Sequence, residues 1–125
     1  MSFKTDYGRV QGLGSAKDGT HHFWTQRLSA IALIILTPFF IIPLAYTLGL
    51  PHAQMLETYQ HPFHAIVAAL FILTCFYHLK LGLQTVIEDY THGGTRTALI
   101  VFANLLCGAL GFSGLFAVAK IAFSG

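Results

Sequence analysis

Three long apolar runs constrain this chain more than any other feature of its sequence. They extend over about 28–50, 62–87 and 98–123, and the first contains no Asp, Glu, Lys or Arg. At about 1.5 Å per residue, a helix over each run is long enough to cross the ~30 Å hydrocarbon layer of a bilayer. A backbone inside that layer must satisfy its own hydrogen bonds, which a helix does. The sequence therefore predicts an all-α membrane protein with three transmembrane helices.

Composition excludes several other classes of protein. Of the 125 residues, 54% are hydrophobic and 10% are charged, against roughly 25% charged in ordinary soluble domains. The net charge is +2 without a basic cluster, so no nucleic-acid partner is expected. A small proton-coupled transporter usually has a carboxylate deep in a span, whereas Glu88 and Asp89 lie at a span end. A membrane protein this small is expected to complete its structure against partner subunits and lipid.

The polar segment 1–27 is predicted to form an N-terminal arm, followed by the three-helix membrane region over 28–125. Four basic residues lie in this arm: Lys4, Arg9, Lys17 and Arg27. The short connection between the first two spans has no Lys or Arg, whereas the second, with the helix-breaking pair Gly93-Gly94, carries Arg96. Because basic flanks stay on the cytoplasmic side, the N-terminus and the second connection are predicted to be cytoplasmic.

Small residues recur along the third span, at Ala103, Cys107, Gly108, Gly111 and Gly114. Small residues allow transmembrane helices to approach closely. We therefore expect a helix association surface here rather than a ligand site, with Cys75 and Cys107 as packing residues.

His78 is the most informative polar residue, because it lies about two-thirds of the way along the second span. A neutral imidazole at that depth either hydrogen-bonds across helices or ligates a metal such as haem iron. Gly82 follows one turn later on the same face and leaves room for a flat macrocycle. Helix-bridging histidines are the more frequent case, so the residues alone leave both interpretations open.

Asp89 and Tyr90 mark the predicted cytoplasmic end of the second span. Asp89 follows His78 by eleven residues, which returns a helix to nearly the same face, about 16 Å further along the axis. A tyrosine beside a carboxylate can donate a hydrogen bond to a quinone carbonyl and manage its protons. The alternative is an interfacial tyrosine beside a solvated helix-end charge, which composition alone favours.

Trp24 and Arg27 lie at the start of the first span, where aromatic anchors and snorkelling cations are common. The guanidinium of Arg27 can also bind a carboxylate such as Asp89, or a haem propionate. Lys80 comes two residues after His78 and points to another side of the helix. It either snorkels to the interface or pairs with a propionate, and its role stays open.

Two segments together resemble one known family. The stretch 78–93, HLKLGLQTVIEDYTHG, resembles the H-x-x-x-G…D-Y-x-H-G segment of the small hydrophobic membrane anchor of succinate dehydrogenase, respiratory complex II. The form of this motif is closest to the alphaproteobacterial and mitochondrial branch. The stretch 22–29, HFWTQRLS, resembles the motif that precedes the first helix of that family.

The resemblance implies a four-subunit complex of the respiratory chain and tricarboxylic acid cycle. A flavoprotein would oxidise succinate, an iron–sulfur subunit would relay the electrons, and two anchors would form a helix bundle that binds ubiquinone. This chain would be one anchor, without succinate chemistry of its own, in the bacterial inner (cytoplasmic) membrane. The alternatives are the anchor of a fumarate reductase, or a structural membrane subunit without a cofactor.

The same resemblance implies a haem site. His78 would be an axial ligand of the iron of a b-type haem, with Gly82 beside it. Arg27 and Trp24 would lie near the haem propionates and the quinone pocket. No other histidine of the chain lies at a matching depth on another span. The resemblance implies that the second axial ligand is a histidine of the other anchor, and this absence supports it.

The resemblance implies a quinone site as well. Tyr90 would hydrogen-bond a ubiquinone carbonyl, and Asp89 would support the proton path from the cytoplasm.

Overall fold

The chain is helical over most of the residues that this computed structural model describes, which are 5–11 and 18–124. The elements are α1 (Asp6–Gln11), α2 (Asp18–Thr47), α3 (His52–Gln60), α4 (Pro62–Tyr90) and α5 (Gly93–Phe123). Within the described ranges there is no strand, so the all-α prediction is confirmed. Of the basic residues in the predicted arm, Lys4, Lys17 and the side chain of Arg9 lie outside the described part.

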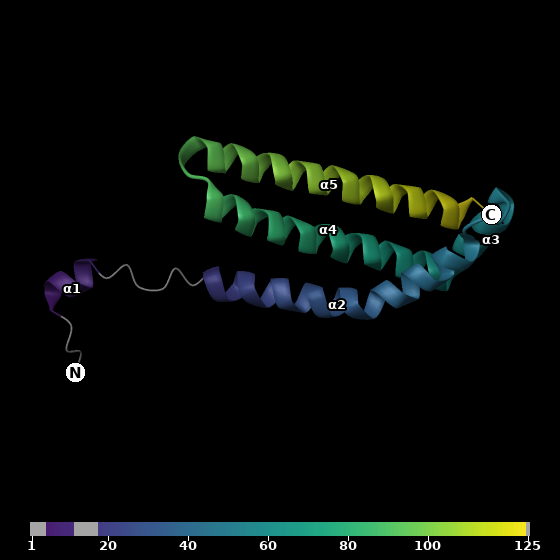
Figure 1. Cartoon of the computed structure of the whole chain (residues 1–125), viewed down its shortest axis with the longest axis horizontal. Helices are drawn as coiled ribbons and strands as arrows, with labels where there is room; N and C mark the ends of the chain where they lie inside the picture. The colour runs from purple at the N-terminus through teal and green to yellow at the C-terminus, as the bar shows by residue number, and fades with distance from the viewer. Residues whose placement is uncertain (1–4, 12–17, 125) are drawn as a thin grey trace.

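Three helices, α2, α4 and α5, are long and apolar enough to cross a membrane. Figure 1 shows them side by side, with α4 in the middle. α4 packs against both neighbours, whereas α2 and α5 do not pack against each other in the described residues. Each helix extends beyond its apolar run at one end, and α2 begins at Asp18, inside the polar arm. At its other end α2 stops at Thr47 rather than at about 50, because the chain turns at Gly49. Helical hydrogen bonds continue into polar sequence, so hydropathy alone underestimates helix length.

The connection between α2 and α4 contains α3, a short helix that hydropathy does not reveal. α3 touches the ends of α2, α4 and α5. Gly49 has φ +90°, a left-handed conformation that turns the chain after α2. Pro62 opens α4 at a position where its missing N–H is not needed, and Nδ1 of His61 accepts from the backbone N–H of Phe63 at 3.3 Å.

The connection between α4 and α5 is much shorter than the sequence suggested, because only Thr91 and His92 separate the two helices. Gly93 has φ +65°, which favours glycine at this reversal. Arg96 then donates to two carbonyls at the end of α4, those of Thr91 and Glu88, each at 2.8 Å. A cation at a helix C-terminus satisfies free carbonyls and complements the helix dipole.

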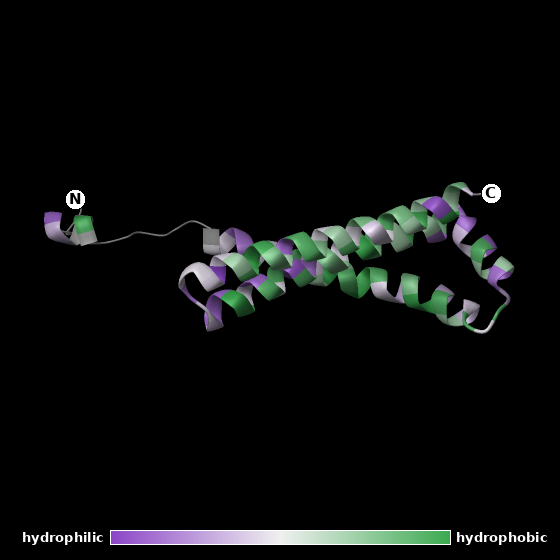
Figure 2. Ribbon diagram, turned by 90° about the horizontal axis from the view of Figure 1, so that it is seen from above, coloured by the Kyte–Doolittle hydropathy of each residue, from purple (hydrophilic) through white to green (hydrophobic). Residues whose placement is uncertain are grey.

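α2 is not parallel to its neighbours along its whole length. Pro38 and Pro43 lie inside it, and proline removes a helical hydrogen bond. Figure 2 shows the C-terminal end of α2 diverging from the other two long helices. α2 contacts α4 beyond its midpoint as well, because the rings of Phe40 and Phe71 are stacked with their centroids 4.4 Å apart.

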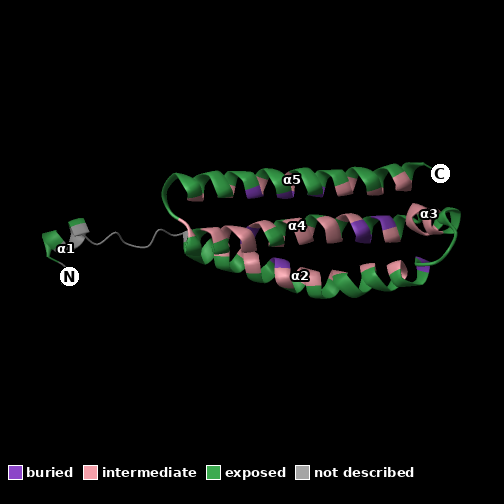
Figure 3. Cartoon of the chain, turned by 45° about the horizontal axis from the view of Figure 1, so that its top comes forward, coloured by how far each residue is buried: buried purple, intermediate pink, exposed green. Residues whose placement is uncertain are grey.

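Little of the chain is buried in its own structure. The buried apolar residues are Ala65, Val67, Ala68, Leu81, Ala103 and Cys107. In Figure 3 the buried positions lie mainly on the sides of the long helices that face one another, while the outer faces are exposed. Many large side chains on these faces are apolar, for example Ile34, Phe112 and Phe116, each more than 70% exposed. Such faces require lipid or partner helices as their surroundings.

The small residues of α5 pack against α4. A Cβ built on Gly111 would lie 3.5 Å from Phe76, and one on Gly114 would lie 3.2 Å from Ile72. Ala103 and Cys107 are buried on the same face. The predicted association surface is thus confirmed for these positions, and its partner is α4 of the same chain. Gly108 differs, because a Cβ added there would meet nothing within 4 Å.

Candidate functional site

His78 lies on the face of α4 that packs against α2. Its Nδ1 is 2.9 Å from Oγ of Ser29, a residue of α2. Ser29 is only 6% exposed, so this hydrogen bond lies inside the helix interface. This contact agrees with one of the two interpretations left open by the sequence, a histidine that hydrogen-bonds across helices. The bond occupies one ring nitrogen, and Nε2 has no hydrogen bond within the described structure.

Ser29 belongs to a row of polar residues on one face of α2. His22, Gln26 and Ser29 follow at spacings of four and three, which is the repeat of one helix face. Nε2 of His22 and Oε1 of Gln26 are buried and have no hydrogen-bond partner among the described residues. We call these three residues the polar row. Buried polar atoms without partners are costly in a membrane, so the row marks a place for a further polar group.

Gly82 lies opposite this row. A Cβ at Gly82 would lie 3.7 Å from Nε2 of Gln26, at ordinary contact distance. His78 and Gly82 thus share the α2-facing side of α4, as their spacing predicts. No role was predicted for Ser29, Gln26 or His22, although their helical spacing was a signal that could have grouped them.

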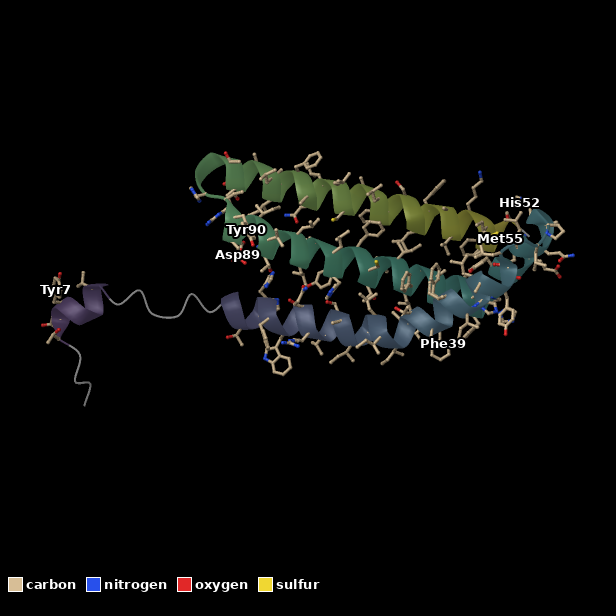
Figure 4. The ribbon with its side chains drawn as sticks, viewed as in Figure 1. Tyr7, Phe39, His52, Met55, Asp89 and Tyr90 are labelled. Carbon is tan, nitrogen blue, oxygen red and sulfur yellow. The ribbon has the colours of Figure 1, made fainter. Side chains whose placement is uncertain are left out.

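Asp89 and Tyr90 end the same helix. α4 runs without interruption from Pro62 to Tyr90, so the assumption that placed Asp89 on the His78 face holds. Both are exposed, Tyr90 to 81%. Figure 4 places them at the end of the molecule where α4 turns into α5, whereas His52 and Met55 lie at the other end. An exposed phenol and an exposed carboxylate are available to a ligand or a partner subunit.

Trp24 and Arg27 lie away from His78. Trp24 is 58% exposed and packs edge-on against Phe23, with ring centroids 6.2 Å apart. The guanidinium of Arg27 lies over the Phe23 ring at 5.1 Å, a cation–π contact. Both side chains are exposed, and the described structure contains no ion pair between Arg27 and Asp89. The structure therefore groups His78 and Gly82 with the polar row, and leaves Trp24 and Arg27 on an outer face.

Lys80 lies on a different side of α4 from His78, as expected. It lines an open groove of about 250 Å³ between α4 and α5. Asn104, Tyr77 and Gly108 line the same groove. This groove adds no group to the His78 face.

A second polar cluster lies at the opposite end of the helices. The rings of Tyr59 and His64 are 6.5 Å apart, and both Oη of Tyr59 and Nδ1 of His64 are buried without a partner in the described region. Burial raises the pKa of Tyr59, and the nearby Thr47 hydroxyl lowers it in part. The phenol therefore stays neutral at physiological pH. No sequence motif pointed to this cluster.

Comparison with known proteins decides the family. A model of the family described as succinate dehydrogenase/fumarate reductase transmembrane subunit matches residues 1–112. The chain belongs to this family. The stretches that carry the resemblance, 22–29 and 78–93, both lie within the matched residues.

Individual members of the family are similar over most of this chain. The succinate dehydrogenase hydrophobic membrane anchor subunit of Paracoccus denitrificans is 38% identical over 97% of this chain and 94% of its own length. The subunit of the same name from Rickettsia conorii is 31% identical over 84% of this chain and 85% of its length. A membrane anchor subunit from Reclinomonas americana is 26% identical over 69% of this chain and 74% of its length. No solved structure matches.

Family membership and the three long apolar helices together make the chain a multi-pass membrane protein. For this transmembrane subunit, the described residues contain no group of three or more His, Cys, Asp and Glu side chains that could hold a metal ion.

Proposed function

We propose that this chain is one of two membrane-anchor subunits of a succinate:quinone oxidoreductase. It would tether the flavoprotein and iron–sulfur subunits, and it would share in the binding of haem b and ubiquinone. Membership of the transmembrane subunit family and the similarity to proteins named as succinate dehydrogenase anchors support the anchoring role. The broad exposed apolar faces of α2 and α5 support a second anchor as a partner.

The hydrogen bond between Ser29 and His78 carries the haem part of the proposal. It occupies Nδ1 and leaves Nε2 for an iron atom. A histidine that ligates a metal usually donates a hydrogen bond from its other ring nitrogen. Gly82 one turn away and the unpartnered atoms of His22 and Gln26 are compatible with a large group bearing polar substituents. The bound haem would supply one-electron redox chemistry.

The quinone part rests on the exposed end of α4. The Tyr90 hydroxyl would donate a hydrogen bond to a quinone carbonyl, which stabilises negative charge as the quinone is reduced. Asp89 would exchange protons with water at the same membrane face. We propose that this end is cytoplasmic in a bacterial inner membrane, because basic residues such as Arg27 and Arg96 flank it.

An optical difference spectrum tests the haem assignment. The purified native complex is expected to show a b-type α-band in a dithionite-reduced minus air-oxidised spectrum, and His78→Ala is expected to lose it. His92→Ala is the matched control, because His92 is exposed and lies outside the spans. A native complex without the band, or a His78→Ala complex that keeps it, would overturn the haem assignment. Succinate-dependent quinone reduction by the same samples tests the anchor role independently.

The family description favours one further candidate, because it covers fumarate reductase as well as succinate dehydrogenase. The direction of turnover depends on cofactor potentials, which the anchor only tunes. Measuring succinate oxidation and fumarate reduction with the same complex distinguishes the two. Fumarate reduction by a quinol that is faster than succinate oxidation by the same complex would favour the second candidate.

A further inference from the structure

The Ser29 hydroxyl makes two contacts but has a single hydrogen. Its Oγ donates to the backbone carbonyl of Gln26 at 2.9 Å, and it is also 2.9 Å from Nδ1 of His78. If the hydroxyl hydrogen points to the carbonyl, Oγ is an acceptor toward His78, and Nδ1 must carry a proton to form the bond. If it points to Nδ1, the contact with the Gln26 carbonyl is lost.

The protein surroundings decide between these arrangements. Ser29 is 6% exposed, so water does not replace a contact that its hydroxyl loses. The Gln26 carbonyl keeps its ordinary helical hydrogen bond in either arrangement, so the difference lies in the Ser29 hydroxyl itself. Only the arrangement with a proton on Nδ1 makes both contacts hydrogen bonds. In a neutral imidazole, Nε2 then carries the lone pair.

We propose that Ser29 is a positioning residue that holds His78 in the Nδ1–H tautomer and presents the lone pair of Nε2 to haem iron. This inference rests on the proposed haem ligation by His78. Ser29 acts through the imidazole and does not touch the iron. The bond joins α2 to α4, so it also fixes the plane of the ring relative to both helices.

The chemistry of the acceptor sets the electronic effect. When Nδ1–H donates a hydrogen bond to an acceptor, the ligating nitrogen becomes more basic, and a hydroxyl oxygen has a weaker effect than a carboxylate. A more basic ligand favours the ferric state, so removal of the Ser29 hydroxyl is expected to raise the midpoint potential of the haem. Because the ring is also freed to rotate, the low-spin ferric electron paramagnetic resonance signal is expected to shift.

The test uses the whole purified complex with Ser29→Ala, Ser29→Thr and Ser29→Val. Thr and Val have nearly the same shape and differ in the hydroxyl, so this pair separates hydrogen bonding from packing. Ser29→Thr is expected to keep the native potential and resonance signal, whereas Ser29→Ala and Ser29→Val are expected to raise the potential and to retain haem roughly ten- to hundredfold less tightly. Ser113→Ala is the control, because that hydroxyl bonds only within α5, to Ala109.

Each outcome bears on the proposal. The role of the Ser29 hydroxyl is overturned if Ser29→Ala and Ser29→Val leave the haem potential and the resonance signal unchanged. It is also overturned if Ser29→Thr and Ser29→Val change them equally. If the complex with Ser29→Ala does not assemble, the comparison of Ser29→Thr with Ser29→Val decides. If His78→Ala removes the haem but the Ser29 variants behave like the native complex, only this inference fails. If His78→Ala keeps the haem, the proposed ligation fails and the role of Ser29 fails with it.

Discussion

Single residues at the His78 site show which part of the chemistry is visible in sequence. His78 and Gly82 were recognisable because an ionisable residue and a glycine one turn apart are unusual in an apolar span. Ser29 was not, because a serine in a membrane helix usually bonds its own backbone. Ser29 does so, and it also contacts a residue 49 positions away. Such a pairing depends on how α2 and α4 are aligned, which no local pattern contains.

Tyr90 allows a test of the quinone proposal at this scale. Tyr90→Phe removes one hydroxyl from an exposed position and should leave the fold intact. We expect succinate-dependent quinone reduction to fall about tenfold in kcat/KM for the quinone, equivalent to roughly 1.4 kcal/mol of lost transition-state stabilisation. The haem spectrum should stay unchanged. Steady-state assays across quinone concentrations measure the effect.

Tyr46→Phe is the matched control for that experiment. Tyr46 is 80% exposed, similar to Tyr90, but it lies near the C-terminal end of α2. Equal losses in the two variants, or no loss in Tyr90→Phe, would contradict a hydrogen bond from Tyr90 to the quinone.

At the scale of helices, hydropathy predicted the three long elements but not their ends or the short helix between two of them. α3 was missed because His52–Gln60 is polar and only nine residues long, so no apolar run marks it. The start of α5 at Gly93 was missed because a glycine pair ordinarily breaks a helix. Here Gly93 takes a left-handed conformation just before regular helix begins, and Arg96 ties the turn to α4.

The interface between α4 and α5 provides a prediction for packing. Gly114→Leu should force α5 away from Ile72, because even a Cβ at Gly114 would lie 3.2 Å from that side chain. Overpacking of this kind costs about 1–3 kcal/mol. We expect a lower Tm for the detergent-solubilised complex, measured by loss of native fluorescence on heating.

Gly108→Leu is the control for the packing prediction. Gly108 lies on the same helix, but a Cβ added there would meet nothing within 4 Å. A Tm loss in Gly108→Leu as large as in Gly114→Leu would contradict close packing at Gly114 as the cause.

At the scale of the whole molecule, the membrane orientation is open to direct measurement. In a chain with Cys75 and Cys107 replaced by Ala, Thr95→Cys probes the α4–α5 turn and Thr58→Cys probes α3. We expect a membrane-impermeant maleimide to label Thr58→Cys in intact cells, and Thr95→Cys only in inverted membrane vesicles, because Arg96 flanks the turn. The reverse labelling pattern would place the proposed quinone end on the wrong side for cytoplasmic protons.

The brace formed by Arg96 has a consequence for how a ligand reaches the end of α4. Arg96, in the first turn of α5, donates to the backbone carbonyls of Glu88 and Thr91, so the backbone that carries Asp89 and Tyr90 is tied to α5. If Tyr90 binds the quinone as proposed, it does so from a fixed backbone position rather than from a mobile loop. A quinone would then reach Tyr90 without an opening movement of the α4–α5 turn.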